Sequence, residues 1–172
     1  LVSILPGMAQ TEKLTDYVNP FVGTDGYGNV YPGAQIPFGG IQISPDTDSR
    51  FYDAASGYKY NHLTLMGFSL THLSGTGIPD LGDFLFIPGT GEMKLEPGTH
   101  EDPDQGYRSR YSHDKEWASP NYYAVELADY GVKAEMTSGV RSGMFRFTYP
   151  ESDNAFIMID MNHTLCQSCE WS

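Results

Sequence analysis

Short apolar runs, several of them alternating apolar with polar positions, recur along the chain and stop at Pro, Gly or Asp. No segment of about eleven or more residues has the amphipathic spacing of a helix. The last run, AFIMIDMN, is apolar without alternation, as expected for a strand buried on both faces. The pattern predicts strands over 39–45, 83–89, 121–129, 131–139, 143–150 and 155–162.

The connections favour antiparallel pairing. From residue 121 onward the predicted strands recur every 10–12 residues or so, and 128–131 and 138–143 are typical hairpin turns. Residues 96–120 are polar and charged, and we expect a long surface excursion with one short strand near 107–112. The spacing predicts an all-β fold, an antiparallel two-sheet β-sandwich or a barrel.

Residues 19–40 differ from the rest, with six glycines and three prolines among them. Such a stretch predicts a long loop, and long loops inside compact domains usually serve function. Glycine lets a backbone approach a ligand closely. The spacing of the known phosphate-binding glycine motifs is missing, so a phosphate cradle is not supported.

Composition narrows the function classes. At 172 residues, one domain with a real core is expected. The net charge is −12 and no basic cluster occurs, which argues against nucleic acid and anionic membrane as partners. No apolar run approaches the roughly 20 residues that span a bilayer.

The first residues, LVSILPGMAQ, resemble the tail of a secretory signal peptide, although a first strand is the alternative. We therefore expect residues 1–10 to be a signal-peptide remnant and 11–172 the domain of an exported protein, periplasmic, outer-membrane-associated or secreted. Cys166 and Cys169 lie in CQSC without a second metal-binding pair, so zinc is disfavoured. Export would permit a disulfide, which the sequence leaves open.

Candidate chemistry is concentrated in FSLTHLSGTGIPDLGDF, residues 68–84. His72, Ser74 and Asp80 supply the residue types of a catalytic triad, but no G-x-S-x-G elbow accompanies them. Residues 48–62 place tyrosines beside carboxylates, which suits sugars but equally suits a tyrosine-rich strand edge. A glycosidase needs two carboxyl groups flanking the bond, and spacing cannot choose a pair among 22 acidic residues.

Two longer stretches carry a family resemblance. YVNPFVGTDGYGNVYPGAQIPFGGIQISPDT, followed by SGYKYNHLTLMGFSLTHLSGTGIPDLGDFLFIPGTG, resembles the start of glycoside hydrolase family 92, the calcium-dependent α-mannosidases. The later segment from YSHDKEW to FRFTYP is similar to that family too. The resemblance covers about residues 16–163.

The resemblance implies a two-domain enzyme. Its N-terminal β-sandwich, a supersandwich like that of galactose mutarotase, packs on a C-terminal (α/α)₆ barrel. The barrel holds the catalytic acid, the base and most calcium ligands, so no catalytic or metal-binding residue is expected in this chain. The implied reaction is inverting hydrolysis of terminal, often α-1,2-linked, mannosides. The implied partners are mannose-containing glycans and the chain's own catalytic domain, and the exposed interface could also pair two copies.

The resemblance also implies substrate-binding residues at the pocket rim. Tyr52 occupies a position where members often have Trp. Family members often have His where this chain has Asn29, Leu70 and Phe145, which puts an imidazole role there in doubt. The candidate substrate-binding residues are Asp25, Tyr52, Asp53, Tyr58, His72 and Asp80.

Two other functions fit the residues: a stand-alone carbohydrate-binding module, and a purely structural sheet domain. The two-domain hypothesis further predicts exposed apolar side chains near residues 20–80, where the barrel would dock.

Overall fold

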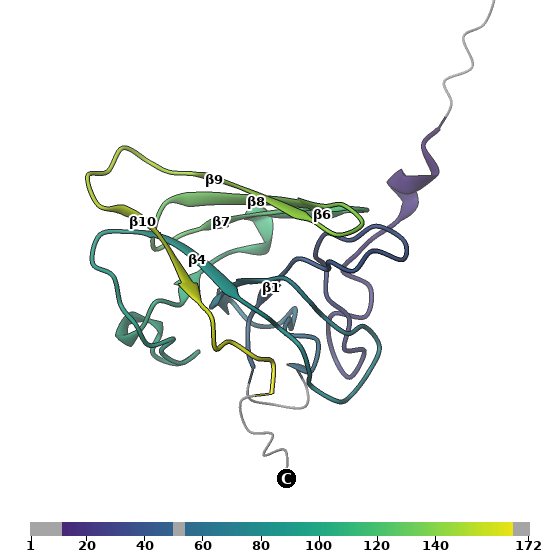
Figure 1. Ribbon diagram of the computed structural model, residues 1–172, viewed down its shortest axis with the longest axis horizontal. Coiled ribbons are helices and arrows are strands. Elements are labelled where there is room, and N and C mark those ends of the chain that lie inside the picture. The colour runs from purple at the N-terminus through teal and green to yellow at the C-terminus, as the bar shows by residue number, and fades with distance from the viewer. Residues whose placement is uncertain (1–11, 50–53, 167–172) are drawn as a thin grey trace, which may run out of the picture.

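The structure is a computed structural model that describes residues 12–49 and 54–166 (Figure 1). All strand pairs in this part of the chain are antiparallel, and it contains no α-helix, which confirms the all-β prediction. Among the described residues are the 3₁₀ turns η1 (Leu14–Tyr17), η3 (Pro103–Gln105) and η4 (His113–Lys115). No helix among these residues could cross a membrane.

One sheet has the strand order β1-β3-β4-β10. Its strands come from distant parts of the sequence, so its pairing depends on long loops. They are β1 (Ser44–Asp46), β3 (Gly67–Ser69), β4 (Leu85–Thr90) and β10 (Ala155–Asp160). β2 (Thr64–Leu65) and β5 (Ser109–Arg110) form a separate two-stranded sheet.

The other sheet is a meander with the order β6-β7-β8-β9. The predicted hairpin turns are confirmed: the amide of Gly131 donates to the carbonyl of Leu127, and that of Gly139 to Ser142. The strands are β6 (Glu116–Ser119), β7 (Tyr122–Leu127), β8 (Val132–Ser138) and β9 (Gly143–Thr148).

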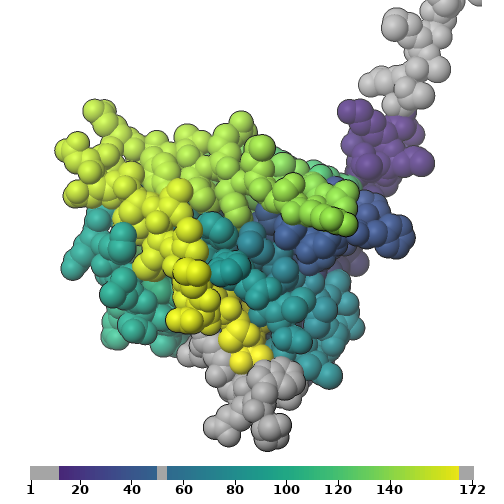
Figure 2. Space-filling view, in the orientation of Figure 1, coloured from purple at the N-terminus to yellow at the C-terminus, as the bar shows by residue number. Residues whose placement is uncertain are grey.

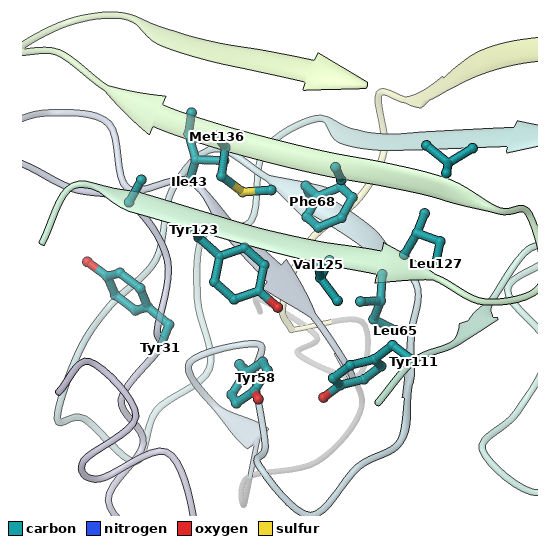
Figure 3. Packing of buried hydrophobic residues seen from close by; sticks show 13 residues of the cluster. Tyr31, Ile43, Tyr58, Leu65, Phe68, Tyr111, Tyr123, Val125, Leu127 and Met136 are labelled. Atoms are coloured by element: carbon teal, nitrogen blue, oxygen red, sulfur yellow. The ribbon is translucent and has the colours of Figure 1, made fainter. Parts of the chain in front are cut away.

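The core fills the space between the two sheets. Alternate residues of β7 and β8 point into it, as the sequence pattern requires, and meet side chains from β2, β3 and the loops (Figure 3). Its largest buried members include Tyr58, Phe68, Tyr123, Val125 and Met136. A smaller cluster of Met66, Leu85, Ile87 and Tyr107 lies on the opposite face of β4.

Two expectations were wrong. β10 is not buried on both faces: it is the last strand of its sheet, and Ile157 and Ile159 are about half exposed. The excursion 96–120 is not only surface, because it ends in β6, whose Glu116 is buried. The apolar pattern could not identify β6, because its inward residue is a carboxylate.

Candidate functional site

The glycine-rich loop packs against two later loops and forms one surface, which we call the loop face. The amide of Tyr60 donates to the carbonyl of Thr24 at 2.9 Å, and the amide of Gly75 donates to that of Asn29 at 2.7 Å. These bonds bring together segments that are up to about 50 positions apart in the sequence. The loop face consists of residues 21–30, 60–62 and 73–80.

A tight turn shapes the first segment of the loop face. Gly23 and Gly26 have φ of 86° and 59°, in the left-handed region that favours glycine. Gly28 passes so close to Gly23 that a Cβ there would lie 2.2 Å from its carbonyl oxygen. The residue types of this loop are therefore dictated by its backbone path.

Two predicted site residues, Asp25 and Asp80, lie on the loop face. Oδ1 of Asp25 accepts a hydrogen bond from the amide of Gly26 at 2.7 Å, and Asp25 is exposed. Oδ1 of Asp80 accepts from the amide of Leu81 at 2.8 Å, and Asp80 is half-buried. Both carboxylates are held by the local turn and remain in reach of solvent.

A third predicted residue, His72, lies beneath the loop face in a buried network. Its Nε2 is 2.8 Å from Oδ1 of Asp46, whose Oδ2 is 2.7 Å from Nε2 of His163. Nδ1 of His72 is 2.7 Å from the carbonyl oxygen of Gln42. Asp46 thus ties β1 to two segments that are distant in sequence.

The electrostatics of this network favour a charged carboxylate. Burial by itself would raise the pKa of Asp46, but the charge and hydrogen bonds of His72 and His163 outweigh it and hold that pKa at about 2. Both nitrogens of His72 are engaged within the network, and Ser74 is exposed on the loop face. The structure therefore assembles no triad from His72, Ser74 and Asp80, in line with the missing elbow.

A second network continues from the same strand. Oγ1 of Thr47 is 3.0 Å from Nδ1 of His62, and Oδ2 of Asp48 is 3.2 Å from Nε2 of His100. The buried Arg108 donates to the carbonyl of Thr47 at 2.6 Å. These contacts fix the chain directly before residues 50–53.

Tyr52 and Asp53, the two candidates nearest to these networks in sequence, lie outside the described residues. The segments on both sides, 46–49 and 54–58, are buried. The chain thus enters and leaves this stretch from fixed positions in the interior.

The last candidate, Tyr58, is buried in the core. Its hydroxyl donates to Glu116 at 2.9 Å, and the hydroxyl of Tyr123 donates to the same carboxylate at 2.5 Å. Nδ1 of His113 is 2.6 Å from Glu116 as well. Burial, and then the neighbouring Tyr111 and Glu116, raise the pKa of Tyr58 far above its usual range. Tyr58 therefore supports the loop face from below.

Tyr60 belongs to the loop face but is not among the site residues predicted from the sequence. It is 37% exposed, and its ring stacks on His113 with centroids 3.9 Å apart and planes 3° from parallel. The YKY stretch gives no alternation that would single out Tyr60, because Tyr58 and Lys59 are both buried and Tyr60 is exposed.

Exposed apolar side chains occur on and near the loop face, as the two-domain hypothesis predicted for residues 20–80. Val22, Tyr27, Phe38 and Ile78 are each more than half exposed. Phe38 also has a left-handed φ of 60°, an unusual conformation for a bulky residue. A hollow of about 640 Å³ opens beside them, with Val22, Gln35 and Asn121 among its lining residues.

Within 12–49 and 54–166, no group of three or more His, Cys, Asp or Glu side chains could hold a metal ion. Cys166 is disulfide-bonded, and Cys169 lies outside the described residues.

Two solved structures similar to this chain are mannosidases. Over 92% of this chain, a family GH92 α-mannosidase from Bacteroides thetaiotaomicron, solved with mannoimidazole, is 99% identical with a TM-score of 0.90. An inverting mannosidase of the family from the same organism is 28% identical over 87% of this chain, with a TM-score of 0.69. The chain covers only 21% and 20% of these two proteins.

Sequence comparisons agree. An uncharacterized secreted glycosidase of Arthroderma benhamiae is 30% identical over 139 residues, which are 80% of this chain and 17% of that protein. Residues 17–171 match the glycosyl hydrolase family 92 N-terminal domain. The chain therefore belongs to glycosyl hydrolase family 92, of which it represents the N-terminal domain.

Proposed function

We propose that this chain is the N-terminal sandwich of an exported α-mannosidase that acts with a second, catalytic domain. The observation that carries the proposal is the 99% identity, over 92% of the chain, to an α-mannosidase solved with mannoimidazole. Export is supported by the relative that is named a secreted glycosidase and by the signal-like first residues.

The loop face is the part of this domain best suited to meet the sugar. Asp25 and Asp80 present carboxylates that can accept hydrogen bonds from hydroxyl groups, and Tyr60 presents an aromatic ring. In this proposal Tyr52 and Asp53 also contribute to the rim. His72 and Tyr58, both buried, hold the face in place without touching the sugar.

The reaction we propose is inverting hydrolysis of terminal α-1,2-linked mannosides. Inversion needs two carboxyl groups about 6.5–9.5 Å apart with a water between them, and both would come from the catalytic barrel. Calcium, which would help to bind and distort the mannose ring, would be held there too, as the resemblance to the family implies.

Docking of that barrel onto the loop face is supported by Val22, Tyr27, Phe38 and Ile78. Each of these four side chains is more than half exposed, and interfaces between domains are partly apolar.

Mannose release by the full-length protein tests the proposal. Mannobioses with different α-linkages are offered with calcium, after chelation, and after calcium is restored. We expect release from the α-1,2 isomer, loss on chelation and recovery with calcium. No release from any α-mannoside would overturn the proposal. Release that chelation leaves unchanged would overturn the proposed dependence on calcium.

A carbohydrate-binding module is the second candidate, favoured by the exposed rings of Tyr27 and Tyr60 beside carboxylates. It predicts that loop-face variants weaken glycan binding without any mannosidase activity in the full-length protein.

A further inference from the structure

β10 is an edge strand without the features that normally protect one. It pairs with β4 on one side, and no strand among the described residues pairs with the other. Natural edge strands are shielded by lysine, proline, a bulge or a covering segment. The sequence of β10, AFIMID, contains none of these residues and only one charge. Figure 2 shows β10, in yellow, uncovered on this face of the molecule.

The exposed isoleucines of β10 point toward the interior of the sandwich. Ile159 is the cross-strand partner of Phe86, so both side chains lie on the same face of the sheet. The ring of Phe86 lies 4.8 Å from that of Phe145 on β9, which places this face toward the other sheet. Ile157 and Ile159 are nevertheless 51% and 50% exposed, because the facing sheet ends at β9.

The backbone on the same strand also has free bonding groups. The amide of Gly91 donates to the carbonyl of Asn154, so in an antiparallel ladder every second residue from 154 bonds to β4. The intervening residues, Ile157 and Ile159 among them, direct N–H and C=O away from β4. Pro88, which has no N–H, is accommodated opposite Ile157 for this reason.

We propose that a strand from the polypeptide that family 92 proteins carry outside this chain pairs with the free edge of β10 and covers Ile157 and Ile159. Relatives supply ample chain, since this sequence covers 21% of the solved α-mannosidase. The uninterrupted apolar pattern of β10 is that of a strand buried on both faces, which the described residues alone do not achieve. The strand would present apolar residues inward and complete the core between β9 and β10.

Hydrogen exchange of the full-length protein, resolved to single amides, tests this pairing. We expect the amides of Ile157 and Ile159 to exchange as slowly as that of Met158, which bonds to β4. Fast exchange at Ile157 and Ile159 beside slow exchange at Met158 would overturn the proposal.

A pair of variants separates the added strand from a second copy. Ile159→Arg should lower the Tm of the monomeric full-length protein by several degrees, whereas Met93→Arg, at a position 48% exposed, should leave it unchanged. Equal Tm for both variants would contradict the proposal. A second outcome would also overturn it: the full-length protein is a dimer, and Ile159→Arg dissociates the dimer but does not lower the Tm of the monomer.

Discussion

At the scale of single residues, this domain depends on buried histidine–carboxylate contacts. His72 faces acceptors with both ring nitrogens, Gln42 on one side and Asp46 on the other. The side chains of His72 and Asp46 are both fully buried, so neither can exchange its partner for water. His113 is placed likewise between Glu116 and the carbonyl of Tyr60. The sequence could not reveal the contact of His72 with Asp46, because the two residues are 26 positions apart along the chain.

Replacing Asp46 should be costly and pH-dependent. Removing one partner of a buried pair costs about 3–5 kcal/mol, so we expect Asp46→Asn to lose that much stability at pH 7. The folded pKa of Asp46, about 2, lies below the ordinary 3.8. The stabilisation linked to this shift, about 2 kcal/mol, is therefore complete well above pH 4 and is lost as the pH falls toward 2.

Urea unfolding of the wild type and of Asp46→Asn between pH 7 and pH 2 measures this difference. The exposed Asp25→Asn is the control and should change little at any pH. A gap between wild type and Asp46→Asn that stays constant down to pH 2 would contradict the assigned charge state.

The variant Tyr58→Phe tests whether Tyr58 stabilises the domain or contacts the substrate. Losing the hydroxyl leaves Glu116 with one donor fewer, which should cost about 1–3 kcal/mol of stability. Because Tyr58 is buried, the KM of the full-length enzyme should not change. Tyr123→Phe, which removes the other hydroxyl from this carboxylate, is the matched control. A raised KM for Tyr58→Phe alone would show that Tyr58 reaches the sugar.

At the scale of elements, the strands were predictable where hydrophobic alternation is long enough to be seen. The strands predicted over 83–89, 121–129, 131–139 and 143–150 correspond to β4, β7, β8 and β9. The pattern missed β2 and β3, which have only two and three residues. Their positions follow from pairing with distant partners, which local sequence does not encode. The loop face was likewise predictable as glycine-rich loops, but not the bonds that join its three segments.

The glycine-rich turn should tolerate no side chain at Gly28, where the backbone passes closest to Gly23. In Gly28→Ala the new Cβ would meet the carbonyl of Gly23 at 2.2 Å and force the loop to shift, at about 1–3 kcal/mol. We expect a higher KM for the full-length enzyme and a lower Tm.

Gly77→Ala is the control in the third segment of the loop face, because its Cβ would have its nearest neighbour, a nitrogen of Asn29, at 3.9 Å. Similar kinetics for Gly28→Ala and Gly77→Ala would contradict a role of the turn in shaping the site.

At the scale of the whole molecule, the domain has two surfaces that suggest further polypeptide. Apolar side chains are exposed on and near the loop face. At the other surface, no described strand pairs with the outer edge of β10, and Ile157 and Ile159 are half exposed. The two surfaces differ in the groups available for contact. The loop face presents exposed side chains, whereas the edge of β10 presents side chains together with backbone N–H and C=O groups. The first suits docking of a catalytic domain, and the second suits the addition of a strand.

The central claim is that this domain builds a mannoside site only together with the rest of its protein. Proton NMR of α-1,2-mannobiose, mixed with calcium and either the full-length protein or this chain, tests it most directly. We expect the full-length protein to release mannose first as the β-anomer, through inversion, and the chain by itself to release none. Mannose release by the chain, or none by the full-length protein, would show that the site is not shared between the two parts.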